Sequence, residues 1–162
     1  MSLELSISMK SHATFSSCRK YRYSLFRIWD EDKQLVLFIG LNPSTADEKE
    51  DDPTIRRCIN FAKQWGYGGL IMGNLFAFRA TQPSDLKQAK EPVGENNDKV
   101  IVALSKRADV TVVAWGSDGY LYNRGREVLS LLPKPMCLKI NKSGQPAHPL
   151  YQPKNLVLLP YN

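Results

Sequence analysis

The chain contains few residues that bind metals or form disulfides. It has three cysteines, Cys18, Cys58 and Cys137, and two histidines, His12 and His148. The cysteines are odd in number and scattered, and no Cys-X-X-Cys pair occurs. These features argue against a disulfide framework and against a structural zinc site. We therefore expect the protein to need no metal and no cofactor.

Long apolar runs are also missing, so no segment is long enough to cross a membrane. The stretch 1–10 alternates apolar residues but lacks the basic region and long apolar core of a secretory signal. Neither repeats nor low-complexity segments occur. With 162 residues, 43% of them hydrophobic and 23% charged, the composition is that of a soluble globular protein. We expect one domain spanning 1–162, a cytoplasmic location and no membrane partner.

Acidic residues are absent from two long parts of the chain, although the net charge is only +6. Between Glu4 and Asp30 the Lys and Arg residues are Lys10, Arg19, Lys20, Arg22 and Arg27. After Glu127 the charged residues are Lys134, Lys139, Lys142 and Lys154. Two basic ends of this kind could form one positive face for DNA or RNA. A solvated basic surface without a partner explains the same pattern.

The most informative stretch is 35–47, which reads LVLFIGLNPSTAD. Its five apolar residues, Leu35–Ile39, are typical of a strand buried on both faces. Gly40 then permits a turn or a close approach to a ligand, and Pro43 favours an extended Asn42. Asn42 should therefore follow the carboxyl end of a central strand, where open α/β sheets bind ligands. A plain polar turn is the alternative.

The rest of the chain alternates predicted strands and helices. The predicted strands are 18–30, 70–78, 109–115, 136–140 and 155–159. The predicted helices are 52–65, 95–107 and 120–132, and the segment 84–90 is predicted as a short helix or a turn. The strand 18–30 should form an antiparallel hairpin with 35–39, at or near an edge of the sheet. This alternation predicts an α/β fold with a mostly parallel sheet covered by helices on both faces.

Polar residues follow several of these strands and should meet at one edge of the sheet. They are Asn42, Arg79, Trp115–Ser117 and His148. Asn74 is a further candidate because an amide inside a buried strand needs hydrogen-bond partners or faces a site. Arg56 and Arg57 follow Asp52-Pro53-Thr54 in the first turns of a helix. A helix N-terminus with nearby arginines is a candidate phosphate site.

Four segments in order resemble the uracil-DNA glycosylase superfamily. The segment 40–43, GLNP, resembles the GINP or MNP motif that places a water molecule. The segment 69–74 with Arg79-Ala80 resembles the strand carrying a base-reading Asn, and 113–117, VAWGS, resembles an LWGS strand end. The segment 147–150, AHPL, resembles the HPSP loop, which supplies a His and a wedge side chain. With its GLNPSTAD, DPTIRR and HPLY motifs, the chain also resembles an uncharacterised bacterial family of unknown function.

The resemblance implies a fold and an activity. The fold is a three-layer αβα structure whose core is a parallel four-stranded sheet in order 2-1-3-4, with flanking N-terminal and C-terminal strands. The activity is hydrolysis of the N-glycosidic bond of a base in DNA, RNA or a nucleotide, as in DNA repair. Asn42 would place the water and His148 would donate a hydrogen bond to the base. The implied substrate-binding residues are Gly40, Pro43, Asn74, Phe76, Arg79, Trp115, Ser117, Leu150 and Tyr151.

Several departures from the family pattern keep other functions open. The loop reads His-Pro-Leu-Tyr, the terminal helix of true glycosylases is replaced by a short predicted strand, and no early motif supplies an Asp general base. Three cysteines also exclude the iron–sulfur branches, which need four. One alternative is a nucleotide-binding or nucleic-acid-binding module without catalysis. Another is a different hydrolase, with Ser44, Ser117 or Cys58 beside His148 and an acid such as Asp118, although no Gly-X-Ser-X-Gly elbow occurs.

Overall fold

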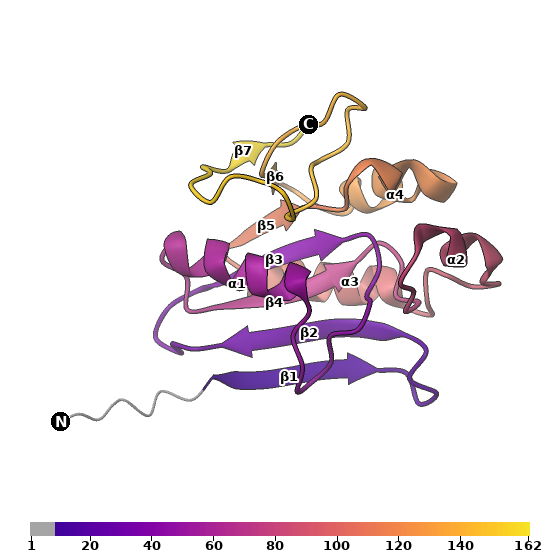
Figure 1. Cartoon of the computed structure of the whole chain (residues 1–162), viewed down its shortest axis with the longest axis horizontal. Helices are drawn as coiled ribbons and strands as arrows, with labels where there is room; N and C mark the ends of the chain where they lie inside the picture. The colour runs from indigo at the N-terminus through magenta and orange to yellow at the C-terminus, as the bar shows by residue number, and fades with distance from the viewer. Residues whose placement is uncertain (1–8) are drawn as a thin grey trace.

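The computed structural model describes residues 9–162, which form an α/β fold around a seven-stranded mixed sheet (Figure 1). The strands are β1 (Lys10–Phe15), β2 (Arg22–Ile28), β3 (Leu35–Gly40), β4 (Gly69–Asn74), β5 (Val110–Val113), β6 (Pro135–Cys137) and β7 (Leu159–Pro160). The helices are α1 (Pro53–Gln64), α2 (Pro83–Gln88), α3 (Asn97–Arg107) and α4 (Arg124–Leu129), with the 3₁₀ segment η1 (Ser117–Asn123). The predicted α/β class is confirmed. No helix within these residues is both long and apolar enough to cross a bilayer.

The strand order is β1-β2-β4-β3-β5-β6-β7, with β3 in the middle of the sheet. β3 pairs in parallel with β4 and with β5, and β5 pairs in parallel with β6. The pairs β1–β2, β2–β4 and β6–β7 are antiparallel. Because β3, β4 and β5 run in the same direction, their carboxyl ends meet at one edge of the sheet.

The predicted hairpin between the strands 18–30 and 35–39 is wrong. β2 pairs with β1 and β4, and β4 separates it from β3. The reason is visible at Gly68, whose carbonyl accepts hydrogen bonds from Trp29 and Asp30 while its N–H donates to Gln34. A Cβ on Gly68 would lie 2.0 Å from the Asp30 carbonyl oxygen. Only glycine at this position therefore lets β4 enter the sheet between β2 and β3.

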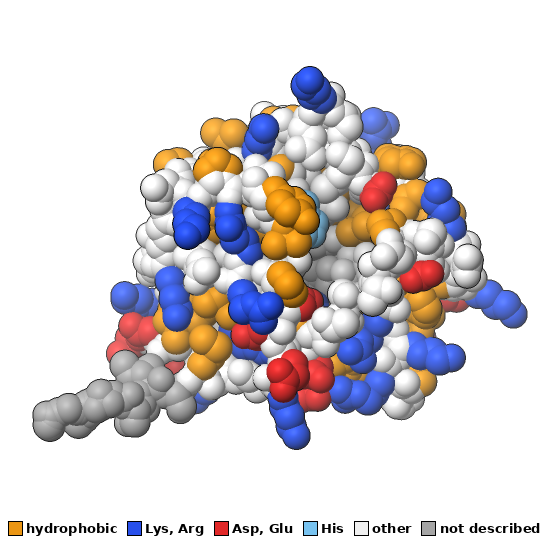
Figure 2. Space-filling view, in the orientation of Figure 1, with side chains coloured by type: hydrophobic (Ala, Val, Ile, Leu, Met, Phe, Trp, Pro, Cys, Tyr) orange, Lys and Arg blue, Asp and Glu red, His pale blue; other side chains and the backbone are white. Residues whose placement is uncertain are grey.

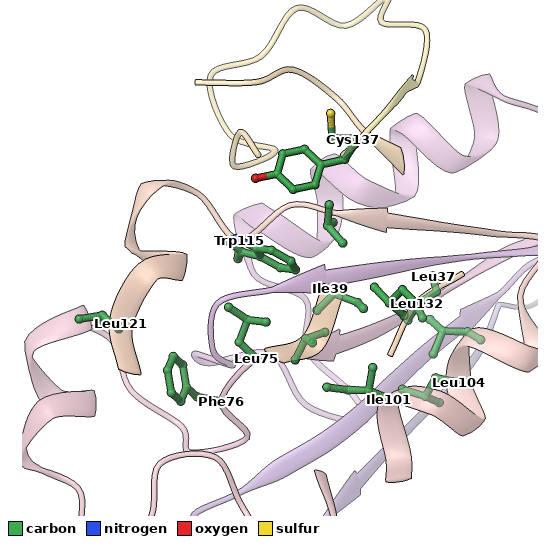
Figure 3. Close-up of a cluster of buried hydrophobic side chains, with 14 of the residues drawn as sticks. Leu37, Ile39, Leu75, Phe76, Ile101, Leu104, Trp115, Leu121, Leu132 and Cys137 are labelled. Carbon is green, nitrogen blue, oxygen red and sulfur yellow. The ribbon is translucent and has the colours of Figure 1, made fainter. Parts of the chain in front are cut away.

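The side chains of β3 alternate between two buried layers, which explains its uninterrupted apolar run. Val36 and Phe38 belong to the layer that contains Ile55 and Cys58 of α1. Leu37 and Ile39 pack on the opposite face, in the cluster with Ile101 and Leu104 of α3 (Figure 3). The two helices therefore cover opposite faces of the sheet, and β3 is fixed from both sides.

Several elements are shorter than predicted. β4 ends at Asn74 and β6 at Cys137, and of the last predicted strand, 155–159, only Leu159 lies in a strand, as the first residue of β7. The predicted helix 120–132 is divided into η1 and α4, because Leu121 and Tyr122 have non-helical backbone angles and Tyr122 has a φ of 52°. The apolar spacing of this segment does not reveal the break.

Candidate functional site

A pocket of about 400 Å³ lies where the carboxyl ends of β3, β4 and β5 meet the N-terminus of α1 and the loop at His148. Figure 2 shows a hollow near the centre of this face, with hydrophobic side chains and histidine atoms at its rim. The stretches that contribute lining residues are 40–44, 52–55, 80–83, 114–118 and 148–150, together with Arg22, Met72 and Asn74. The volume is within the usual range for small-molecule sites, roughly 300–1,000 Å³.

Asn42 is held in one orientation by its amide nitrogen. Nδ2 donates to the carbonyl oxygens of Pro43 at 3.0 Å and Ala80 at 2.7 Å. Ala80 in turn donates its N–H to Pro43, so the loop after β3 is joined to the segment after β4. Within residues 9–162 the Asn42 Oδ1 accepts no hydrogen bond. This oxygen is therefore available to accept one from a water molecule or a ligand.

Asn74 ends β4 directly beside Gly40 in the parallel register. Its side chain is almost fully buried, and its Nδ2 has no hydrogen-bond partner within the described part of the chain. A Cβ on Gly40 would lie 2.9 Å from Asn74 Oδ1, so glycine makes room for this amide. An unpartnered buried amide is costly, and here it lines the pocket. A ligand with a matching acceptor would remove that cost.

His148 is half-buried and lines the same pocket. Burial lowers its pKa from the ordinary value of 6.5, and the negative charge of Asp52 opposes part of that shift. The Nδ1 atom accepts a hydrogen bond from the Leu150 N–H at 3.2 Å. In the neutral ring the proton is then on Nε2. His148 is therefore a neutral hydrogen-bond donor at pH 7.

The wall of the pocket after β5 is built around Trp115 and Gly116. The Trp115 ring is buried in the cluster of Figure 3, and its Nε1–H donates to Gln145 Oε1 at 2.9 Å. Gly116 has a φ of +79°, which favours glycine, and its N–H donates to the Pro146 carbonyl. These two bonds fix the segment that leads to His148.

The structure thus brings most of the predicted site residues together. Those that line the pocket are Gly40, Asn42, Pro43, Asn74, Trp115, Ser117, His148 and Leu150. They come from three strand ends and one loop, as expected for a site at the carboxyl edge of a parallel arrangement.

A family model with the description "Protein of unknown function (DUF1643)" matches residues 22–150. The chain belongs to this family. No curated protein and no solved structure matches the chain. The matched range begins at Arg22 and ends at Leu150, and it contains every residue that lines the pocket.

Two of the predicted aromatic contacts lie elsewhere. Phe76 is fully buried and packs in the cluster with Leu75 and Leu121 (Figure 3), because the chain turns after β4 and directs this ring into the core. Tyr151 is 96% exposed and does not line the pocket. It follows Leu150 of the pocket lining and has a backbone φ of 69°.

The three predicted arginine contacts are also outside the pocket lining. Arg79 donates to the carbonyls of Ser44 and Arg19 and lies over the Phe15 ring. The turn of α1 directs Thr54 and Ile55 into the pocket, which rotates the next two residues away. Arg56 is exposed and bonds the Asp51 carbonyl, and Arg57 lines a separate depression beside Phe61. The Asp52 carboxylate already occupies the helix N-terminus.

Ser44, Ser117 and Asp118 of the alternative hydrolase line the same pocket as His148, whereas Cys58 does not. Cys58 is fully buried in the α1 layer, and burial raises the pKa of its thiol. Ser117 hydrogen-bonds to Ser143 and Asn141. Within residues 9–162 no hydrogen bond joins His148 to a serine, a cysteine or an acidic side chain. No cluster of three or more His, Cys, Asp or Glu residues suitable for a metal occurs in that range either.

Two charged residues of the pocket were not predicted to belong to it. Asp52 was expected only as a helix cap, and it does cap α1, with Oδ1 accepting from the Ile55 N–H at 2.9 Å. Arg22 was expected only as part of a basic end, but it is 2% exposed and lines the pocket. It begins β2, whose residues are mostly buried, and no sequence signal reveals this burial.

Proposed function

We propose that this protein hydrolyses the N-glycosidic bond between a base and its sugar, in nucleic acid or in a nucleotide. The observation that carries the proposal is the meeting of Asn42, Asn74 and His148 in one pocket, with the buried Asn74 amide unpartnered. The parallel pairing of β3 with β4 and β5 supports the glycosylase-like fold that the sequence motifs imply.

The reaction needs a water molecule at the anomeric carbon. Bond cleavage passes through an oxocarbenium-like sugar, which reacts with a positioned water without a strong base. Asn42 suits this role because its amide nitrogen is fixed on two carbonyls and its oxygen is an open acceptor. The side chain orients the water. As the new C–O bond forms, the water loses a proton to solvent, and the departed base anion takes up a proton from solvent to leave as the neutral base.

The departing base carries the negative charge. A donor aimed at the base oxygen stabilises this charge, and one such donor contributes typically about 2.7–4 kcal/mol. His148 fits, because its Nδ1 is occupied by the Leu150 N–H and its neutral ring carries the proton on Nε2. Asn74 would read the base edge, since an amide offers both a donor and an acceptor.

The test is a screen for base release. Oligonucleotides that carry uracil, hypoxanthine, xanthine or alkylated bases are incubated with the protein and then probed for abasic sites. On the best substrate, Asn42→Ala should lose most of the single-turnover rate while binding is kept, and His148→Ala should lose about 100- to 1,000-fold. Asn60→Ala, an exposed position on α1, is the matched control. Full activity of Asn42→Ala would contradict the mechanism.

The second candidate is a nucleotide-binding or nucleic-acid-binding module on the same fold. The C-terminal segment favours it, because residues 159–160 pair with β6 as strand β7, where true glycosylases have a terminal helix. Tyr161 then packs on the Trp115 ring and donates to the Gly144 carbonyl. Binding of oligonucleotides or nucleotides by wild type without release of any base would select this candidate.

A further inference from the structure

Among the described residues, three arginine side chains, those of Arg22, Arg27 and Arg124, are almost fully buried, and two of them have carboxylate partners. Arg27 pairs with Asp51 at 2.8 Å and also donates to three backbone carbonyls. Arg124 pairs with Asp98 at 2.6 Å and with Glu127 at 3.4 Å. This is the normal condition for a buried guanidinium, because an isolated charge is expensive to remove from water.

Arg22 is the exception. Its NH1 donates to the Ala46 carbonyl at 2.9 Å, but its Nε is buried without a partner among residues 9–162. No carboxylate in that range lies within ion-pair distance of it. Burial lowers the pKa of Arg22 to about 10, so the side chain is still charged at neutral pH. Unlike Arg27 and Arg124, it lines the pocket.

A second guanidinium stands close to this one. Arg79 donates only to the carbonyls of Ser44 and Arg19, and it too has no carboxylate partner within the described residues. Its positive charge contributes to the lowered pKa of Arg22. Both arginines thus bind the loop that follows β3, at Ser44 and Ala46. Two like charges held together on one loop form a local excess of positive charge.

Asp52 and Asp47 act on Arg22 against the positive charges of Arg79 and Arg27. Within residues 9–162 neither carboxylate forms an ion pair with Arg22, and the Asp52 Oδ1 is used to cap α1. The Asp52 carboxylate also makes the N-terminus of α1 unfavourable for an anion. An anionic ligand group in this pocket is therefore drawn to the Arg22 side of it.

We propose that Arg22, supported by Arg79, binds a phosphate group of the ligand in this pocket. A guanidinium donates two parallel hydrogen bonds to phosphate oxygens, and the Nε of Arg22, which has no partner among residues 9–162, would be one donor of such a pair. Ser44 and Thr81 line the same pocket and offer hydroxyl groups. That the phosphate belongs to a nucleotide or to a nucleic-acid strand rests on the proposed function, whereas the anion site itself does not.

Binding without chemistry tests the site. The probes are inorganic phosphate, a mixture of nucleosides, the matching 5′-monophosphates and a short single-stranded oligonucleotide, measured by calorimetry and by thermal shift at constant ionic strength. Wild type should bind the monophosphates more tightly than the nucleosides. Arg22→Gln should weaken binding of phosphate-bearing probes by about 10- to 100-fold and leave nucleosides unchanged. A preference for the oligonucleotide over the monophosphates identifies a strand phosphate as the source.

Two further variants control for charge and for folding. Lys106→Gln removes one positive charge from an exposed position on α3, away from the pocket lining, and should leave phosphate binding unchanged. Arg22→Lys keeps the charge but loses the planar fork, so it should bind phosphate with intermediate affinity. The empty Arg22→Gln protein should melt no lower than wild type, because the variant removes an unpaired buried charge.

The outcomes separate this proposal from the proposed function. Absence of phosphate binding by wild type, or equal phosphate affinity of wild type and Arg22→Gln, overturns the phosphate site even if base release is found. Phosphate binding that depends on Arg22, without release of any base, supports the site and rejects the glycosidase. A large loss of thermal stability in both Arg22 variants, with phosphate affinity kept, would instead make Arg22 a structural cation.

Discussion

At the scale of single residues, the pocket depends on a close fit between Gly40 and Asn74. The two residues lie side by side in adjacent strands, and the amide of Asn74 occupies the space that a side chain on Gly40 would need. The unpartnered Asn74 amide therefore destabilises the ligand-free fold at the position where a ligand would contact it. Such local violations of good packing are typical of functional sites.

Gly40→Ala should destabilise the protein by forcing Asn74 aside. The added Cβ would lie 2.9 Å from Asn74 Oδ1, and overpacking of this kind costs about 1–3 kcal/mol. The free energy of unfolding in urea measures the effect. In the Asn74→Ala background the same change should cost clearly less, because the clashing atom is gone. Equal costs in the two backgrounds would show that the clash is relieved elsewhere.

His148 should make stability depend on pH. Burial lowers its pKa in the folded state below 6.5, so the unfolded chain binds the proton more readily. Stability from this group is complete above about pH 6.5 and is lost as the pH falls through 6.5 toward the folded pKa. Urea unfolding between pH 5 and 8 should therefore show a smaller acid loss for His148→Gln than for wild type. His12→Gln, at an exposed histidine, is the control.

At the scale of elements, Asp52 serves both α1 and the pocket. Its carboxylate accepts from the Ile55 N–H and also lines the cavity, where its charge acts on His148. A structural role and a chemical role are therefore combined in one side chain, and substitutions can separate them.

Asp52→Ala should lower the free energy of unfolding by about 1 kcal/mol, because α1 loses its cap. Asp52→Asn should keep most of that stability, since an amide oxygen can accept the same bond, but it removes the negative charge from the pocket. Chemical denaturation measures the first effect and single-turnover base release the second. A normal rate in a stable Asp52→Asn protein would restrict Asp52 to its structural role.

The sequence predicts these elements well where a local signal decides them. The apolar run of β3 gives the position of Asn42, and Asp52-Pro53 gives the start of α1. The pairing of β2 is not local, because the strand pattern states which residues are extended but not which strand lies beside them. Its only local hint is the glycine pair Gly68-Gly69, where β4 enters between the other two strands.

The residues of the pocket are likewise predictable only where a local sequence signal exists. The residues of the pocket that follow strand ends are predictable, because parallel strands bring their carboxyl ends together. The burial of Arg22 is not, since a lysine or arginine in a sequence usually indicates the surface. Whether a guanidinium is buried, and whether a carboxylate is near it, depends on contacts such as Arg22 with Ala46, far apart in the chain.

At the scale of the whole molecule, the two basic ends of the chain flank the pocket. The turn at Arg19 and Lys20 is bonded through both backbone carbonyls to Arg79, next to Ala80 of the pocket wall. On the other side, the turn at Lys142 is bonded to Ser117 through its two neighbours, Asn141 and Ser143. Figure 2 shows Lys and Arg side chains spread over this face, with Asp and Glu among them. Arg22 is buried and does not add to this surface, and Arg19 is paired with Glu48.

If a nucleic-acid strand crosses the pocket, its affinity should fall steeply with salt, because bound phosphates displace counterions. Lys20→Gln and Lys142→Gln should each reduce the slope of log affinity against log salt by about 1. Lys106→Gln, beside Leu35 at the opposite end of β3, should leave the slope unchanged. Fluorescence anisotropy of a labelled strand between low and physiological salt measures these slopes. An affinity that does not change with salt concentration, or no binding at low salt, would show that a nucleic-acid strand is not the ligand. The pocket, with its single deep arginine, would then accept a nucleotide-sized molecule.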